Sequence, residues 1–322
     1  MYRVPGRPHL VLVLLLAVFL AVSGCGSRTA STGFAEKPLV CATIYPLYDF
    51  AAKLAGDRAT VRLLLPPGAD VHEWEPGVEV LRALQQADLL VYNGAGLEPW
   101  VERVVASADS PRLRTVEASK GIELLPLSQE EAGAQEADSS VREAGAPLGR
   151  YDPHLWLDPR RARQQAANIL EGLVAADSAG RDYYTARYRV LARRLEQLDF
   201  LYRTLLEGRN RHTFVVSHAA FGYLASRYGL EQIALTGAHA EAEPGPRELV
   251  QVVDLARRLD LRYVFVDELH GRRVAQALAR ELGAEVLSLH PLASLTAEEL
   301  AAGEDYFSLM EENLVQLYRG LE

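Results

Sequence analysis

The chain has 322 residues, of which 49% are hydrophobic and 24% charged, and its formal net charge at pH 7 is -9. This length suits two domains with sizeable cores, and the composition excludes a disordered, collagen-like or disulfide-scaffold protein. The acidic balance argues against a nucleic-acid-binding protein, which needs a basic surface.

The first 24 residues have the pattern of an export signal. Two arginines precede an uninterrupted apolar run of thirteen residues, Leu10–Val22, which is short for a bilayer span and fits a signal peptide. The run ends in a Val-Ser-Gly-Cys sequence that resembles the lipobox of bacterial lipoproteins. That resemblance implies cleavage before Cys25 and a lipid on its sulfur, which would hold the mature chain on the outer face of a membrane. A plain secretory peptide with a chance cysteine is the alternative.

From residue 38 onward, short apolar runs alternate with helical patterns, which is typical of βαβ units and a parallel sheet. The alternation occurs twice, so we expect two α/β lobes, 38–179 and 209–322, each with a mainly parallel four-stranded sheet and flanking helices. Residues 25–37 before them are predicted to form a flexible tether. The expected strands are 39–45, 60–65, 88–93 and 113–117 in the first lobe, and 212–217, 231–235, 262–267 and 284–289 in the second.

Between the lobes the apolar pattern changes to the period of a helix. From Tyr184 to Leu205, apolar residues recur at steps of four and three, which places them in one stripe on one helix. No proline or glycine interrupts residues 182–207, and Gly208 ends the pattern. The sequence therefore predicts one long rigid helix, 180–208, that joins the lobes and limits their hinge motion.

One segment of the first lobe has a different composition. Residues 128–150 contain five carboxylates and no aromatic residue or histidine. We predict a mobile acidic loop. We expect it to be dispensable for a tight metal site, because ordering it would cost about 1–2 kcal/mol per residue in backbone entropy.

Three of the eight histidines stand out by their positions. His218 ends a predicted strand of the second lobe, His72 follows a predicted strand of the first, and His154 lies in a proline-stiffened loop. Open parallel sheets bind ligands outside the carboxyl ends of their strands, so we expect these side chains to meet in a crevice between the lobes. Near the C-terminus, Glu304 and Asp305 are acidic candidates. Imidazoles with one carboxylate make a ligand set for zinc or another first-row divalent ion, although no two of these ligands are close in sequence.

Several motifs, in order along nearly the whole mature chain, resemble the zinc/manganese-binding receptors of bacterial ABC importers. They are residues 44–50, 65–76, 152–158, 217–230, 241–244 and 289–292. The resemblance implies two α/β lobes joined by a single long helix, with a metal site in the cleft. It also implies a monomeric extracytoplasmic receptor, anchored to the cell membrane by lipid. Such a receptor captures a divalent metal ion and hands it to a permease that works with an ATPase.

By the same resemblance, the three histidines named above are metal ligands. The acidic ligand of the family follows a glycine and lies nine residues before an asparagine. Here Asn313 puts that register on Glu304, with Asp305 as the competing choice. Manganese receptors of the family often have Glu in place of the third histidine, so His218 favours zinc, with manganese or iron as alternatives.

Two other classes of function are compatible with parts of the sequence. A zinc hydrolase could use three histidines and leave one position open for water. However, the carboxylate would close that position, and we find no separate general base or nucleophile motif. Receptors of this family have been called adhesins, but nothing in the sequence independently indicates adhesion. We therefore predict a binding protein and not an enzyme.

Overall fold

The computed structural model describes residues 37–127, 150–238, 246–267 and 272–322. The predicted signal peptide, Cys25, nearly all of the predicted tether and residues 128–149 of the acidic loop lie outside these ranges. Within the described residues, no helix combines the length and the hydropathy that crossing a membrane requires. The fold described below belongs to the unit from Lys37 to Glu322.

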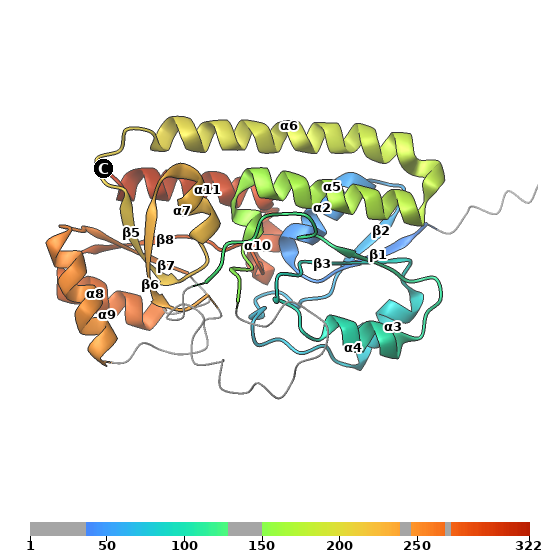
Figure 1. The fold of residues 1–322 in the computed structure, drawn as a ribbon, viewed down its shortest axis with the longest axis horizontal. Coiled ribbons are helices and arrows are strands. Elements are labelled where there is room, and N and C mark those ends of the chain that lie inside the picture. The colour runs from blue at the N-terminus through green and yellow to red at the C-terminus, as the bar shows by residue number, and fades with distance from the viewer. Residues whose placement is uncertain (1–36, 128–149, 239–245, 268–271) are drawn as a thin grey trace, which may run out of the picture. The chain divides into compact units, whose positions relative to one another are not determined.

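Two four-stranded parallel sheets form the centres of two lobes (Figure 1). Both have the same strand order, β2-β1-β3-β4 in the N-terminal lobe and β6-β5-β7-β8 in the C-terminal lobe. The prediction of two α/β lobes is confirmed, and each predicted strand is present. The strands are β1 (Leu39–Ala42), β2 (Thr60–Leu63), β3 (Leu89–Tyr92), β4 (Arg114–Glu117), β5 (Thr213–His218), β6 (Glu231–Thr236), β7 (Tyr263–Val266) and β8 (Glu285–Ser288).

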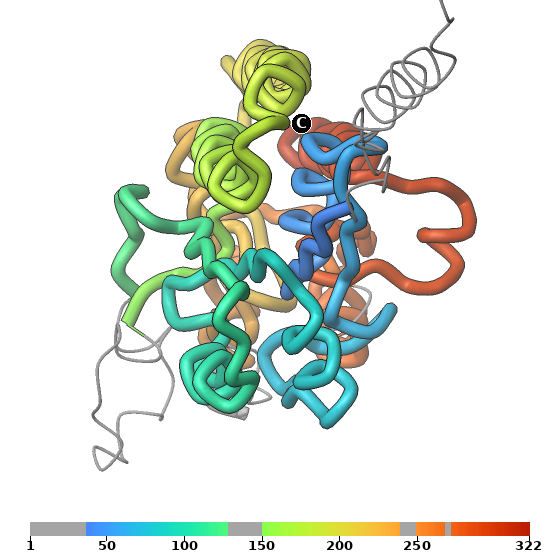
Figure 2. Tube along the Cα trace, turned by 90° about the vertical axis from the view of Figure 1, so that its right-hand side faces the viewer, coloured from blue at the N-terminus to red at the C-terminus, as the bar shows by residue number. Residues whose placement is uncertain are grey.

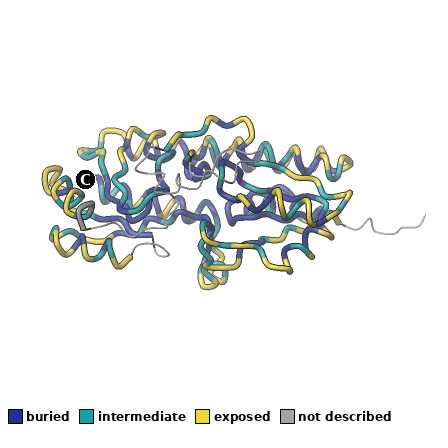
Figure 3. The backbone as a smooth tube through the Cα atoms, turned by 60° about the horizontal axis from the view of Figure 1, so that its bottom comes forward, coloured by how far each residue is buried: buried dark blue, intermediate teal, exposed yellow. Residues whose placement is uncertain are grey.

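Helices cover both faces of each sheet (Figure 1). The inner strands β1, β3, β5 and β7 are mostly buried, whereas the edge strands β2, β4, β6 and β8 are largely intermediate or exposed. Figure 3 shows the burial along the backbone. In the N-terminal lobe, α3 and α4 lie below the sheet and α2 and α5 above it (Figure 1). Buried apolar strand residues such as Val40 and Leu89 are paired across β1 and β3. The helices are α2 (Tyr45–Ala55), α3 (Val78–Gln86), α4 (Val101–Ala108), α5 (Pro159–Ala176), α6 (Arg181–Leu206), α7 (Gly222–Tyr228), α8 (Pro246–Arg258), α9 (Arg272–Leu282), α10 (Ala297–Ala302) and α11 (Tyr306–Gly320).

The predicted long helix is α6, which runs along both lobes and lies beside α5 (Figures 1 and 2). Its predicted apolar stripe is buried from Tyr184 to Tyr202 at most positions, but the last member, Leu205, is 39% exposed and Leu206 is buried instead. One hydrophobic core, to which the stripe belongs, includes residues of both lobes. Because this core is continuous, we expect α6 to act as a rigid strut rather than as a flexible linker.

A second connection between the lobes lies close to the ends of the strands. The segment 289–296, which follows β8, accepts three hydrogen bonds from the N-terminal lobe. Two come from the backbone N–H groups of Tyr45 and Gly68, at 3.0 and 2.9 Å. The third comes from the indole of Trp156, at 2.7 Å. This segment therefore fixes the N-terminal loops against the C-terminal lobe at the edge where the site is expected.

Candidate metal centre

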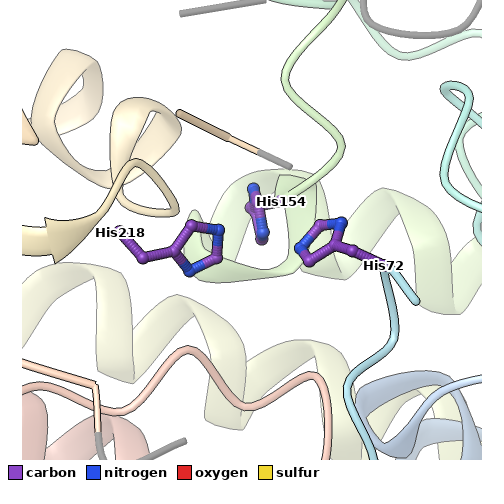
Figure 4. Close-up of side chains that lie close together, drawn as sticks. All are labelled: His72, His154 and His218. Carbon is purple, nitrogen blue, oxygen red and sulfur yellow. The ribbon is translucent and has the colours of Figure 1, made fainter. Parts of the chain in front are cut away.

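Three histidines from the two lobes lie together in the structure. His72 lies in the loop between β2 and α3, His154 directly precedes a short 3₁₀ turn, and His218 is the last residue of β5. One possible ligand nitrogen from each lies within 4.8 Å of the other two. Figure 4 shows the rings turned toward one another, with centroids 5.0–5.4 Å apart. Within the described part of the chain, no other group of three or more His, Cys, Asp or Glu side chains is arranged to hold a metal ion.

The loops that carry the two N-terminal histidines are shaped by the same local device. Asp70 Oδ1 accepts a hydrogen bond from the backbone N–H of His72 at 2.8 Å. Asp152 Oδ1 accepts from the backbone N–H of His154 at 2.9 Å. An aspartate that bonds the backbone two residues later closes a tight turn without regular secondary structure. The Asp-x-His sequence therefore fixes the backbone at both ligand positions.

Asp152 also holds the ring of His154. The imidazole Nδ1 lies 2.9 Å from Asp152 Oδ1, and both side chains are almost fully buried. A carboxylate on Nδ1 fixes the tautomer and leaves Nε2 as the nitrogen for a metal. Asp152 is itself confined by α7, because a Cβ on Gly222 would lie 2.5 Å from its Oδ2. The hydroxyl of Tyr223 also donates to the Asp152 carbonyl at 2.8 Å.

His218 has a different environment in the C-terminal lobe. Its Nε2 donates to the carbonyl oxygen of Ala238 at 3.1 Å. Its Nδ1 lies 3.7 Å from Asp267 Oδ2, a distance longer than a hydrogen bond. Both His218 and Asp267 are 1% exposed. The strand end thus places a buried carboxylate beside the imidazole without closing the bond between them.

A buried carboxyl, Glu98, organises the N-terminal loops behind His154. It accepts hydrogen bonds from the Thr43 hydroxyl and from the backbone N–H groups of Asn93 and Gly94, at 2.6, 2.8 and 3.0 Å. Burial raises the pKa of Glu98 to about 7, and these three donors oppose that rise. The Asn93 amide in turn donates to the carbonyl of Pro153 at 2.9 Å. Glu98 is therefore connected, through Asn93, to the residue that precedes His154.

The role of the acidic pair near the C-terminus as a source of the fourth ligand stays a prediction. The group of ligand atoms that lie within 4.8 Å of one another consists of the three imidazoles. Asp305 is the N-cap of α11, where its Oδ1 accepts from two backbone N–H groups, each at 2.9 Å. Its Oδ2 lies 3.0 Å from the Lys53 ammonium.

The backbone holds Glu304 between two helices. Gly303, with φ of 81°, ends α10, so Glu304 is the single residue between that helix and the cap of α11. Its carbonyl accepts from the Tyr45 hydroxyl at 3.0 Å. The two helix ends therefore fix the backbone of the residue on which the register counted from Asn313 falls.

Sequence reasoning missed the aspartates that surround the histidines. The repeated Asp-x-His at 70–72 and 152–154 was a usable signal for two of them. Asp267 has no such local signal. Its proximity to His218 depends on the pairing of β5 with β7, which a single sequence does not reveal.

The donor set has clear chemical consequences. Three neutral imidazoles form a nitrogen-rich site, which suits zinc and other first-row divalent ions better than the harder magnesium or calcium. The fold and the site together fit a two-lobed receptor of the solute-binding class, with a candidate metal centre to which both lobes contribute.

Comparison with known proteins agrees with this class. The profile of the family described as "Zinc-uptake complex component A periplasmic" matches residues 40–320. The chain belongs to this family, which confirms the resemblance found in the sequence. Membership in a family of zinc-uptake components also confirms the expectation of a binding protein and not an enzyme.

The chain is similar to named relatives of that family. It is 33% identical over 306 residues to the high-affinity zinc uptake system protein ZnuA of Bacillus subtilis, with 94% of each chain covered. It is 34% identical over 308 residues to the zinc-binding lipoprotein AdcA of Streptococcus pneumoniae, which covers 96% of this chain. The chain spans only 60% of the length of AdcA.

The fold is also similar to a solved structure. The Zn(II)-bound ZnuA-like domain of Streptococcus pneumoniae AdcA matches with a TM-score of 0.74 and 32% identity. The match covers 88% of this chain and 99% of that domain. The similarity therefore extends through both lobes and through α6.

Proposed function

We propose that this chain is an extracytoplasmic receptor that binds one zinc ion and delivers it to the permease of an ABC importer, which an ATPase powers. The observation that carries this proposal is the group of three histidines. His72 and His154 lie in loops of the N-terminal lobe, and His218 lies at the end of β5 in the C-terminal lobe, so both lobes contribute to the proposed site. The relatives named as zinc-binding or zinc-uptake proteins support the same function.

We propose His72, His154 and His218 as the metal ligands. Zinc in proteins is usually four-coordinate, so three imidazoles leave one position, for which we propose Glu304, with Asp305 as the alternative. Zinc is preferred over manganese because three of the four proposed ligands are borderline nitrogen donors, whereas carboxylates favour manganese. Manganese and iron are the alternative cargoes, and a competition experiment distinguishes them from zinc.

The hydrolase alternative depends on the fourth position. Three histidines and one water form the zinc site of some hydrolytic enzymes, whereas a carboxylate ligand closes that position. Zinc-loaded protein is expected to show stoichiometric binding and no turnover of activated esters. Turnover that the His154→Ala variant lost would contradict the proposal of a receptor.

We further propose that the mature chain is a monomer attached to the outer face of the membrane through a lipid on Cys25. The lipobox-like sequence and the name of the AdcA lipoprotein support this attachment. Cys25→Ser is expected to release the protein from the membrane fraction as uncleaved or soluble material. Mass spectrometry that finds unmodified Cys25 in membrane-bound protein would contradict it.

The experiment that tests the function is a metal titration of the purified protein. We expect one zinc ion per chain, and we expect zinc to displace manganese in direct competition. A protein that bound neither metal, or that bound manganese more tightly than zinc, would overturn the proposed cargo. Loss of zinc uptake in cells without the gene, restored by the wild-type gene and not by a His218→Ala variant, would support delivery.

A further inference from the structure

The end of β7 places a buried carboxylate beside the histidine of the C-terminal lobe. β5 and β7 are parallel neighbours, with Val216 paired to Phe265. Two residues further along each strand are His218 and Asp267, so the register alone brings them side by side. The Asp267 backbone N–H donates to the Ser217 hydroxyl at 2.9 Å, which fixes the start of the turn after β7.

The orientation of the His218 ring gives this carboxylate a role. In Figure 4, Nε2 of His218, which is the ring nitrogen farther from Cβ, points toward the other two histidines. Nδ1 faces Asp267 Oδ2 at 3.7 Å. An imidazole that gives Nε2 to a metal carries its proton on Nδ1, and that N–H needs an acceptor. In this structure Nε2 donates to the Ala238 carbonyl at 3.1 Å. Metal binding therefore has to replace the Ala238 bond, and Asp267 is in place to accept the relocated proton.

The charge balance of the site also indicates a role for Asp267. Neutral imidazoles add no charge, whereas a zinc ion brings two positive charges among buried side chains. Asp152 and Asp267 are 3% and 1% exposed, and each lies beside the ring of one histidine. Two buried carboxylates offset the charge of one divalent ion, and the ion in turn offsets the cost of burying them.

We propose that Asp267 is a positioning residue that accepts the Nδ1–H of His218 when the metal is bound, as Asp152 does for His154. This inference rests on the proposed metal-binding function. To reach hydrogen-bond distance, the Asp267 and His218 side chains must approach by ~0.8 Å, which a small side-chain rotation provides. The N-terminal lobe thus has its carboxylate–imidazole pair closed in advance, and the C-terminal lobe closes its pair on loading.

Three variants test the role of Asp267 in affinity. Asp267→Asn keeps the size of the side chain and removes its charge, whereas Asp267→Glu keeps the carboxylate. Asp254→Asn, at an exposed position on α8 of the same lobe, is the matched control. In competition with a zinc-chelating dye at neutral pH, Asp267→Asn should weaken zinc binding by about 10–100-fold. Asp267→Glu should retain more affinity than Asp267→Asn, and Asp254→Asn should match the wild type. Equal affinity of Asp267→Asn and the wild type would overturn the proposal.

A spectroscopic measurement separates positioning from a merely structural role. In zinc-loaded wild-type protein labelled with ¹⁵N at histidine, NMR should place the His218 proton on Nδ1, with a downfield shift typical of a carboxylate acceptor. In Asp267→Asn that proton resonance should move upfield. Coordination of zinc through Nδ1 of His218 would overturn the proposal. The wild-type spectrum also decides the question if Asp267→Asn fails to fold.

Failure of this inference is distinguishable from failure of the proposed function. If wild-type protein binds no zinc, the function is wrong and the role of Asp267 falls with it. If the wild type binds one zinc ion and loses it in His218→Ala but not measurably in Asp267→Asn, only the inference is wrong.

Discussion

The N-terminal lobe and the C-terminal lobe have sheets of the same strand order, but they hold their histidines differently. In the first lobe, Asp152 Oδ1 is bonded to both the backbone N–H and the ring of His154, each at 2.9 Å. In the second lobe, His218 lies at the end of a regular strand, 3.7 Å from Asp267, and its Nε2 is bonded to a backbone carbonyl. A loop ligand is thus fixed by local side-chain bonds, whereas a strand-end ligand is fixed mainly by sheet register.

This difference indicates how loading proceeds. The N-terminal site residues are pre-organised, so a metal ion gains affinity there without reordering the loop. The His218 ring must exchange a hydrogen bond before it binds, so the adjustment on loading is expected mainly in the C-terminal lobe. Because α6 and the continuous core limit hinge motion, this adjustment is local.

The largest expected effect comes from removing a ligand of the pre-organised lobe. His154→Ala should lower zinc affinity by orders of magnitude, because two imidazoles leave the coordination shell incomplete. His212→Ala is the matched control, since His212 is an exposed histidine just before β5. Chelator competition measures both, and circular dichroism checks that the fold persists. Near-native affinity in His154→Ala would show that zinc binds elsewhere.

The next effect concerns the pH dependence of the N-terminal scaffold. Burial raises the pKa of Glu98 from 4.5 to about 7, so the folded state keeps a proton that the unfolded state loses in this window. The contribution of Glu98 to stability therefore falls as pH rises from about 4.5 to 7, by on the order of 3 kcal/mol. Denaturant unfolding at several pH values across this range measures the free energy of unfolding. This free energy should decline less in Glu98→Gln than in the wild type.

Glu102→Gln provides the control for that pH series. Glu102 is exposed on α4, only four residues further along the chain. Its variant should keep the wild-type slope of stability against pH. If Glu98→Gln and Glu102→Gln gave the same slope, the buried carboxyl would not be the group that titrates.

The next largest effect on zinc affinity is expected at Asp152 and Asp267, the two aspartates beside the rings of His154 and His218. Asp152→Asn should weaken zinc binding by about 10–100-fold, and by more than Asp267→Asn, because Asp152 Oδ1 holds both the backbone N–H and the ring of His154. Gly222→Ala should act in the same direction, since its Cβ would lie 2.5 Å from Asp152 Oδ2. Chelator competition ranks the three variants. A larger loss in Asp267→Asn than in Asp152→Asn would reverse the assignment of the pre-organised lobe.

The smallest effect concerns the acidic pair near the C-terminus. Asp305→Ala should reduce the free energy of unfolding by about 1 kcal/mol through loss of the α11 cap. This change should leave zinc affinity unaltered, whereas Glu304→Gln should weaken zinc binding. Urea unfolding and zinc titration of the same samples check both statements. The reverse pattern would move the fourth ligand to Asp305.

The fold was largely predictable because its signals are local. Apolar runs marked all eight strands, and the stripe from Tyr184 to Tyr202 marked α6. The first strand was predicted to reach residue 45 but ends at Ala42, because α2 begins at Tyr45 without a break in the apolar sequence. A helix buried on most sides lacks the alternation that distinguishes it from a strand.

The site was predictable only in part. Strand ends and a proline-stiffened loop marked the three histidines that the structure brings together. The proximity of Asp267 to His218 depends on strand register in three dimensions. Spacing along one sequence does not contain this register.

The central claim is that zinc is bound by three histidines from two lobes. Anomalous diffraction at the zinc edge, from crystals of the zinc-loaded protein, tests it most directly. We expect one zinc peak with Zn–N distances of about 2.0–2.1 Å to His72, His154 and His218, and with Glu304 in the fourth position. A peak at another place, or a shell that lacks any of these three imidazoles, would contradict the claim.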